Sequence, residues 1–329
     1  MSEMRRREFV TLLGAAAVCP LAAHAQRSMM PVIGFMSGRS LQDSDYLVDA
    51  VRQGLREAGY LEGESISIEY RWANGDYDRL PDLASELLAH NVLVLIAVGG
   101  DASAIAAKRA SSSVPVVFGM GGDPVRAGLV ASFNRPGGNA TGFTLLTNQM
   151  ESKRVSLLHE LVPSVSSLGA LINPSFLPAA NQLSDIKNAA ENIQRKLVVA
   201  TVDSDAQLES AFTSLVKQQV GAVLVAAAPF FDTRRERIIG LAAQHRLPTM
   251  YQFREYAVAG GLISYGPNIA DSYRQAGIYA GRILRGAKPS DLPVQQPTRF
   301  EMVINLKTAN ALGLAIPNTM QLLADEVIE

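Results

Sequence analysis

Cysteine is almost absent from this chain, and its one instance, Cys19, lies among the first 25 residues. If that segment is removed, the rest of the chain has no thiol, which excludes thiolate catalysis, disulfide bonds and cysteine metal sites. Histidine is scarce as well. Apart from His24, each histidine lies near the end of an expected helix and lacks a second metal-type ligand three or four residues away: His90, His159 and His245. We therefore expect no metal and no cofactor.

Catalytic motifs are also missing. The chain has no G-x-S-x-G nucleophile elbow, no Walker A loop and no G-x-G-x-x-G after its first expected strand. Gly119-Met120-Gly121-Gly122 is glycine-rich, but Asp123-Pro124 follows where a phosphate loop would continue into its helix. These absences favour a binding protein over an enzyme. An exported α/β enzyme with Asp101 or Asp123 as general base remains the alternative, as does a ligand-sensing module.

The first 25 residues have the order of an export signal. A cationic segment with a twin-arginine pair, Arg5-Arg6-Arg7, precedes an apolar run over 10–23, and Ala23-His24-Ala25 supplies small residues for cleavage. The apolar run of about 14 residues is shorter than the roughly 20 that span a membrane. We expect residues 1–25 to be a twin-arginine signal peptide and the protein to be periplasmic. Lipid attachment at Cys19 is a minority alternative, because the bulky Val18 precedes it.

The charge and the length of the chain after residue 25 indicate its possible partners and its number of lobes. Without the three arginines and two glutamates of the first 25 residues, 27 basic and 29 acidic side chains remain, a net charge of −2. This balance offers no clustered basic face for nucleic acid. About 304 residues exceed what one hydrophobic core usually covers, so we expect two lobes.

Apolar runs and helices alternate along the chain. In the first half, strands are expected at 32–36, 66–70, 92–98 and 114–118, with helices at 41–58, 80–89 and 102–109. The pattern restarts after residue 150, with strands at 168–172, 197–202, 222–227, 248–251 and 262–265 and helices at 179–195, 206–218 and 234–245. A long helix at 272–286 and a late strand at 299–305 follow. Continuous apolar strands between helices are typical of parallel sheets covered on both faces.

The predicted fold class is therefore α/β, with two doubly wound parallel-sheet lobes joined by a multi-stranded hinge. We expect the first lobe to contain residues 31–145 and about 268–298. The second lobe would contain residues 146–267 and about 299–329.

Ligands of open parallel sheets bind beyond the carboxyl ends of the strands. The residues there are small, polar or aromatic, and we take them as the candidate ligand site: Ser37, Gly38, Ser40, Gly99, Gly100, Asp101, Gly121, Asp123, Asn173, Ser175, Phe230, Tyr251 and Tyr265. Helix N-termini at this edge would hold an anionic group, and aromatic rings would cover an apolar body. Each residue also has a structural interpretation: the glycines as turns, the aspartates as helix caps and the tyrosines as packing residues.

Several motifs resemble one known family, the type I periplasmic solute-binding proteins of ABC transporters, in the branch that includes members binding tryptophan and other aromatic acids. The resemblance covers about residues 31–320. It rests on the segments 121–125 (GGDPV), 128–130 (GLV), 135–142 (RPGGNATG), 251–256 (YQFREY) and 260–266 (GGLISYG). It implies a monomeric receptor that closes two lobes on a small molecule and delivers it to an inner-membrane permease.

One segment departs from the family pattern. Many members have Thr-Pro or a hydroxyl residue where this chain has Asp101-Ala102-Ser103. An added carboxylate there would favour a cationic or polyhydroxy ligand over a simple carboxylate. From the sequence we expect a soluble receptor for an amino acid or an aromatic or carboxylate metabolite.

Overall fold

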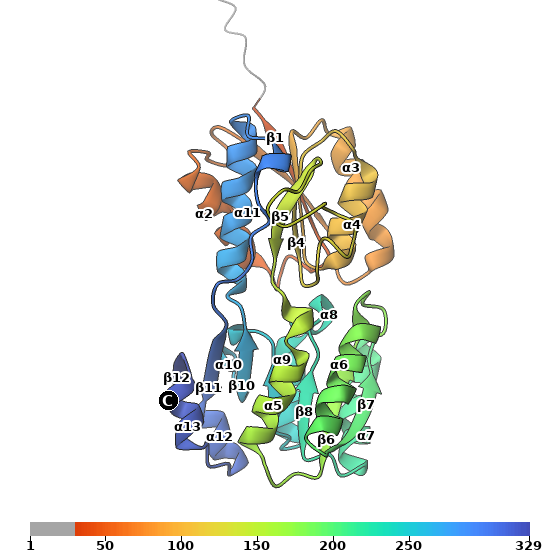
Figure 1. Ribbon diagram of the computed structural model, residues 1–329, viewed down its shortest axis with the longest axis vertical. Helices are drawn as coiled ribbons and strands as arrows, with labels where there is room; N and C mark the ends of the chain where they lie inside the picture. Colours follow the sequence, from red (N-terminus) through yellow and green to blue (C-terminus); the bar gives the residue numbers. More distant parts are fainter. Residues whose placement is uncertain (1–29) are drawn as a thin grey trace, which may run out of the picture. The chain divides into compact units, whose positions relative to one another are not determined.

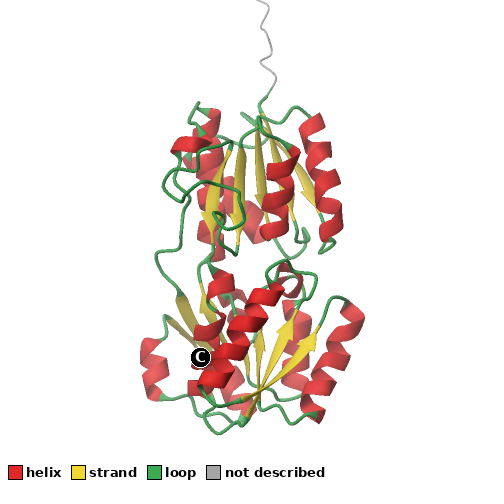
Figure 2. Ribbon diagram, turned by 45° about the vertical axis from the view of Figure 1, so that its right-hand side comes forward, coloured by secondary structure: helices red, strands yellow, loops and turns green. Residues whose placement is uncertain are grey.

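The apolar runs of the sequence form two separate β-sheets. The computed structural model describes residues 30–329, and residues 31–329 form one compact unit. The expected signal peptide and Cys19 lie outside the described residues. Figures 1 and 2 show the two sheets, each with helices on both faces. The α/β class with parallel sheets in two lobes is confirmed.

The first sheet has five parallel strands in the order β2-β1-β3-β4-β5. Their bounds are β1 Val32–Ser37, β2 Ser67–Trp72, β3 Val94–Val98, β4 Val116–Met120 and β5 Ala140–Thr144. Every residue of β3, β4 and β5 is buried, which is why β3 and β4 read as continuous apolar runs. Sequence reasoning missed β5, because threonines and Gly142 interrupt its apolar pattern.

Helices cover both faces of this sheet: α2 Asp45–Glu57 and α11 Ile269–Leu284 on one, and α3 Leu80–Ala89 and α4 Asp101–Ala110 on the other (Figure 1). The backbones of α2 and α11 approach closely at two glycines. A Cβ on Gly54 would lie 1.9 Å from the Arg274 carbonyl oxygen, and one on Gly277 would lie 2.1 Å from the Val51 carbonyl oxygen. This contact holds α11 on the first sheet. The helix expected from residue 41 begins only at Asp45.

The second sheet has seven strands in the order β12-β11-β10-β9-β8-β6-β7. Neighbours are parallel except β10 and β11. The strands are β6 Ser167–Ile172, β7 Lys196–Thr201, β8 Ala222–Val225, β9 Thr249–Tyr251, β10 Ile263–Gly266, β11 Glu301–Asn305 and β12 Glu326–Ile328. The helices are α5 Glu151–Leu161, α6 Ala179–Asn192, α7 Asp205–Lys217, α8 Pro229–Asp232, α9 Arg235–Gln244, α10 Arg254–Val258, α12 Leu306–Leu312 and α13 Asn318–Leu323. Sequence reasoning missed β12 and the helices α8, α10, α12 and α13, and it placed a helix end near His159 without giving bounds for α5.

Three connections join the two sheets: residues 145–150, residues 267–268 and residues 292–300. The first contains a short 3₁₀ turn, Thr147–Gln149. The third pairs with β5, because the Thr144 N–H donates to the Gln295 carbonyl at 2.9 Å and the Gln295 N–H donates to the Gly142 carbonyl at 2.8 Å. The connections therefore form the multi-stranded hinge of the predicted fold.

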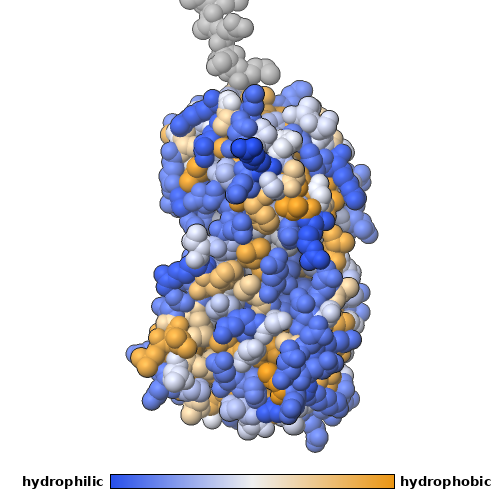
Figure 3. All heavy atoms as spheres, in the orientation of Figure 1, coloured by the Kyte–Doolittle hydropathy of each residue, from blue (hydrophilic) through white to orange (hydrophobic). Residues whose placement is uncertain are grey.

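The outer surface of the protein is mostly polar on the face that Figure 3 shows. Figure 3 shows hydrophilic side chains over most of one face, with smaller hydrophobic groups among them. Among residues 30–329, no helix combines the length and apolarity that crossing a membrane requires.

Candidate ligand-binding site

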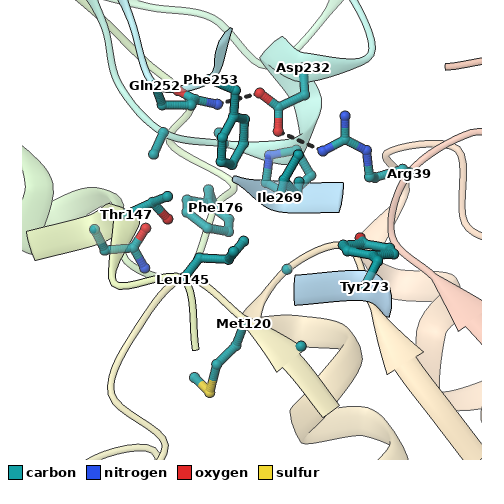
Figure 4. Close-up of a pocket in the computed structure, with 18 of the residues that line it drawn as sticks. Arg39, Met120, Leu145, Thr147, Phe176, Asp232, Gln252, Phe253, Ile269 and Tyr273 are labelled. Atoms are coloured by element: carbon teal, nitrogen blue, oxygen red, sulfur yellow. Dashed lines mark hydrogen bonds and ion pairs between the residues drawn. The ribbon is translucent and has the colours of Figure 1, made fainter. Parts of the chain in front are cut away.

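A cavity lies between the two sheets, at the carboxyl ends of their strands (Figure 4). Residues from both sheets and from the connections line it: Arg39, Gly99, Gly100, Gly119, Met120, Gly121, Phe143, Leu145, Thr147, Asn148, Phe176, Ala227, Ala228, Pro229, Asp232, Gln252, Phe253, Ile269 and Tyr273. The cavity has the place that strand-end reasoning predicts for a ligand.

Glycines form part of the wall from the first sheet. Gly100, at the N-terminus of α4, has φ +121°, a conformation that L-residues with side chains rarely adopt. A Cβ there would lie 3.0 Å from Pro229 Cγ and 3.6 Å from Phe176 Cε2, both in the second lobe. The two lobes thus meet across Gly100 with no room for a side chain.

Asp101 lies behind this wall. Its Oδ1 accepts hydrogen bonds from the N–H groups of Gly121, at 2.8 Å, and Gly122, at 3.3 Å, and Oδ2 accepts from Asn148 Nδ2 at 3.4 Å. Burial raises the pKa of Asp101 to about 6, although the two backbone N–H groups act in the opposite direction. All these partners belong to the protein, so this carboxylate organises the β4 turn.

A buried ion pair connects the lobes at one end of the cavity. Arg39 Nη1 of the first lobe lies 2.7 Å from Asp232 Oδ2 of α8, and both side chains are at most 5% exposed. Arg39 Nε also donates to Ser44 Oγ at 3.3 Å. Burial opposes the charge of Arg39, but Asp232 raises the pKa of the guanidinium above its ordinary value, so Arg39 stays protonated.

Asp232 has further donors at its other oxygen. Gln252 Nε2 donates to Oδ1 (Figure 4), and the Tyr256 hydroxyl donates to the same oxygen at 3.2 Å. Because the amide nitrogen of Gln252 must face this carboxylate, its Oε1 faces away, and Oε1 is buried without a hydrogen-bond partner. Gln252 lines the cavity beside the ion pair, and its Oε1 is a buried acceptor that no group among the described residues satisfies.

Thr147 and Asn148 contribute polar groups from the first connection. Both Asn148 bonds are long, at 3.4 Å to Asp101 Oδ2 and 3.5 Å from Gln182 Nε2. Bonds of this length are weak, so the amide retains hydrogen-bonding capacity for a ligand. The rest of the lining is largely apolar: Met120, Phe143, Leu145, Phe176, Pro229, Phe253, Ile269 and the ring of Tyr273. The cavity therefore combines an apolar body with charged and amide groups.

The structure places only some of the predicted residues at this cavity. Gly99, Gly100 and Gly121 line it. Ser37 and Gly38 are buried beside it, where Ser37 Oγ accepts the Arg39 N–H at 3.1 Å and a Cβ on Gly38 would lie 2.4 Å from the Gly99 carbonyl oxygen.

The other predicted residues are not in its lining. The Ser40 hydroxyl donates to Asp43, and Asp123 accepts the Val125 N–H at 2.8 Å and so caps a turn. Asn173 is buried and Ser175 is exposed. The aromatic residues are packed within the second lobe: Phe230 beneath the Arg234 guanidinium, Tyr251 stacked on Tyr256 and Tyr265 stacked on Phe300.

Sequence reasoning missed the charged and amide residues of the cavity. Arg39 lies between two residues that were selected, Gly38 and Ser40, and Gln252 directly follows Tyr251. The same strand-end rule would therefore have identified both residues. Asp232 and Tyr273 have no such signal, because their positions depend on how α8 and α11 pack. Among the described residues, no cluster of histidine and carboxylate side chains has the arrangement of a metal site.

Comparisons with known proteins agree with this geometry. A family model described as "ABC transporter substrate binding protein" matches residues 30–328. The curated "Tyrosine-binding protein" of Clostridioides difficile (strain R20291) is 25% identical over 264 residues, which is 80% of this chain and 75% of that protein.

Two solved structures are similar over 91% of this chain and 99% of their own. One is a conserved domain protein from Vibrio cholerae, with 26% identity and a TM-score of 0.81. The other is an ABC domain from Streptococcus pneumoniae in complex with L-Trp, with 25% identity and a TM-score of 0.80. The family resemblance inferred from the sequence is confirmed.

Proposed function

We propose that this chain, which belongs to the ABC transporter substrate-binding protein family, captures an α-amino acid with an aromatic or large apolar side chain. One observation carries the proposal: the interlobe cavity has apolar walls and a single buried Arg–Asp pair at one end. Such a cavity matches a ligand that has an uncharged body and a zwitterionic head group.

The head-group assignment follows from the free donors and acceptors. Arg39 has five N–H donors, and two of its nitrogens already bond Asp232 and Ser44, so donors remain for a ligand carboxylate. The unpartnered Gln252 Oε1, beside the Asp232 carboxylate, offers an acceptor for a ligand ammonium. Asn148 adds an amide with spare bonding capacity.

The ligand body would lie among Met120, Phe143, Phe176 and Phe253. Aromatic side chains bury much apolar area and form favourable offset or edge-to-face pairs with other rings. The tyrosine-binding relative and the structure with bound L-Trp support an aromatic ligand, because both are 25% identical to this chain.

Closure provides the signal for transport. The Arg39–Asp232 pair, and the contact of Gly100 with Pro229, join residues of the two lobes. A ligand that contacts both walls stabilises the closed arrangement over the open one, which shifts the population toward the form that a permease recognises. We propose that the protein acts as a monomer and carries out no chemistry on its ligand.

The location follows from the family and the N-terminal sequence. Substrate-binding proteins of ABC transporters work outside the cytoplasm, and residues 1–25 would export this one to the periplasm by the twin-arginine route. Replacing Arg6 and Arg7 with lysine should leave the protein in the cytoplasm. Export of that variant at the normal level would contradict this route. If the Cys19→Ala variant is released with the soluble periplasmic proteins to the same extent as the wild-type protein, lipid attachment at Cys19 is excluded.

The ligand proposal is tested by calorimetric titration and thermal shift with L-tyrosine, L-tryptophan, L-phenylalanine, L-leucine and glycine. A ligand at 100 times its dissociation constant should add about 2.7 kcal/mol to the free energy of unfolding. We expect the aromatic amino acids to bind best, and the ligand should be recovered unchanged. Binding of sugars or nucleosides but no amino acid would contradict the proposal, and turnover would indicate an enzyme.

A further inference from the structure

A second buried ion pair lies next to the cavity without lining it. Glu151 and Arg154 are three residues apart on α5, both side chains are 0% exposed, and Arg154 Nη1 lies 3.2 Å from Glu151 Oε2. Burying two charges costs much desolvation free energy. Glu151 Oε2 and Arg154 Nη2 also lack hydrogen-bond partners, so the pair is not optimised for stability alone. Its contacts indicate a different role.

Arg154 binds the backbone of one hinge connection and of the strand that leads into another. Its Nη1 donates to the Thr147 carbonyl at 3.1 Å, and its Nε donates to the Tyr265 carbonyl at 2.8 Å. Thr147 lines the cavity, and Tyr265 lies in β10 just before the connection that leads to Ile269, which also lines it. Because the guanidinium is planar and rigid, it holds the first connection and the end of β10 at a fixed spacing.

Glu151 holds a third segment of the cavity wall. Its Oε1 accepts the Ala227 N–H at 2.9 Å and Gln182 Nε2 at 3.1 Å. Gln182 Nε2 also donates to the Ala227 carbonyl at 2.8 Å, so both backbone groups of Ala227 are fixed. Ala227 follows β8 and lines the cavity.

We propose that Glu151 and Arg154 are positioning residues, which set ligand affinity by holding the first hinge connection, the end of β10 and the Ala227 segment in the arrangement that the closed cavity requires. Neither side chain touches the ligand. The affinity readout rests on the proposed function, because it uses an amino acid as probe.

Two variants separate positioning from stability. Arg154→Lys keeps the positive charge beside Glu151 but loses the rigid fork that reaches both carbonyls. The double variant Glu151→Leu/Arg154→Met removes both charges, a change that often leaves stability intact. The matched control is Arg195→Lys, because Arg195 also donates to backbone carbonyls of the second lobe, those of Pro163 and Gln194, away from the cavity.

The dissociation constants for L-tryptophan and L-tyrosine are measured well below the melting temperature of each variant. We expect Arg154→Lys and the double variant to raise both constants at least tenfold while the unliganded melting temperature changes by a few degrees, and Arg195→Lys to bind like wild type. Wild-type affinity in either folded variant would overturn the proposal. Failure of both variants to fold would also overturn it, because the role would then be structural.

A ligand-free measurement separates this inference from the proposed function. If the wild-type protein binds none of the amino acids tested above, the proposed function fails, and the inference is then judged from small-angle X-ray scattering of the unliganded proteins. A larger radius of gyration for Arg154→Lys than for wild type and Arg195→Lys would support the positioning role. Equal radii would overturn it.

Discussion

Replacing Arg39 with methionine should weaken ligand binding far more than it weakens the fold. With the lobes in contact, as in this structure, Asp232 would then be buried without its cation, with only Gln252 and Tyr256 as donors. When the lobes separate, water reaches the carboxylate and the penalty disappears. The cost therefore falls on the closed, ligand-binding state, and unfolding of the unliganded protein is affected little.

The magnitude follows from the burial of the pair. Removing one partner of a buried ion pair costs about 3–5 kcal/mol, because the remaining charge stays uncompensated. Two remaining hydrogen bonds offset part of this penalty at Asp232, which leaves about 2–4 kcal/mol. Since each 1.4 kcal/mol is a factor of ten, the dissociation constant should rise roughly 30- to 700-fold.

Isothermal titration with the best-binding amino acid measures this change, and the unliganded melting temperature is recorded in parallel. Arg52→Met is the control, since Arg52 pairs with Glu62 at the surface of the same lobe, where such pairs contribute at most about 1 kcal/mol. The double variant Arg39→Met/Asp232→Leu should recover part of the loss, because no unpaired charge remains. The reasoning is refuted if Arg39→Met changes the dissociation constant less than threefold.

Three further predictions concern residues selected from the sequence. The pKa of Asp101 is about 6 in the fold, against an ordinary 3.8. Between these two values the native state therefore binds more protons than the unfolded state. The free energy of unfolding should fall by about 3 kcal/mol as the pH rises from about 4 to 6. Urea unfolding of Asp101→Asn should lack this slope, and an unchanged slope would assign it to another group. Gly100→Ala should weaken ligand binding at least tenfold, because its Cβ meets Pro229 across the cleft. The control Gly128→Ala should not weaken binding, because Gly128 has φ +71° but nothing within 4 Å of its Cβ position. Equal affinities of the two variants in titration would contradict the steric argument. Tyr251→Ala should lower the free energy of unfolding by about 3–5 kcal/mol while ligand affinity is kept, and lost affinity in a stable variant would place Tyr251 in the site.

Strand-end reasoning identified the edge of the first sheet that borders the cavity because β3 and β4 are buried on both faces. Their continuous apolar runs end at glycines, and Gly99, Gly100 and Gly121 line the cavity. The same rule placed Tyr251 and Tyr265 at the edge of the second sheet. There, successive side chains point to opposite faces, and sequence alone does not give the register that decides which face meets the cleft.

The sequence by itself determined the α/β class and the two lobes and predicted the edge that the cavity occupies, because these follow from local periodicity and from the chain's length. Only the tertiary structure decided which charged groups meet there. Arg39 and Asp232 are 193 residues apart, and Arg154 joins Thr147 to Tyr265 across more than 100 residues. Such pairs form only when the lobes and the hinge connections pack together, and no local pattern records that packing.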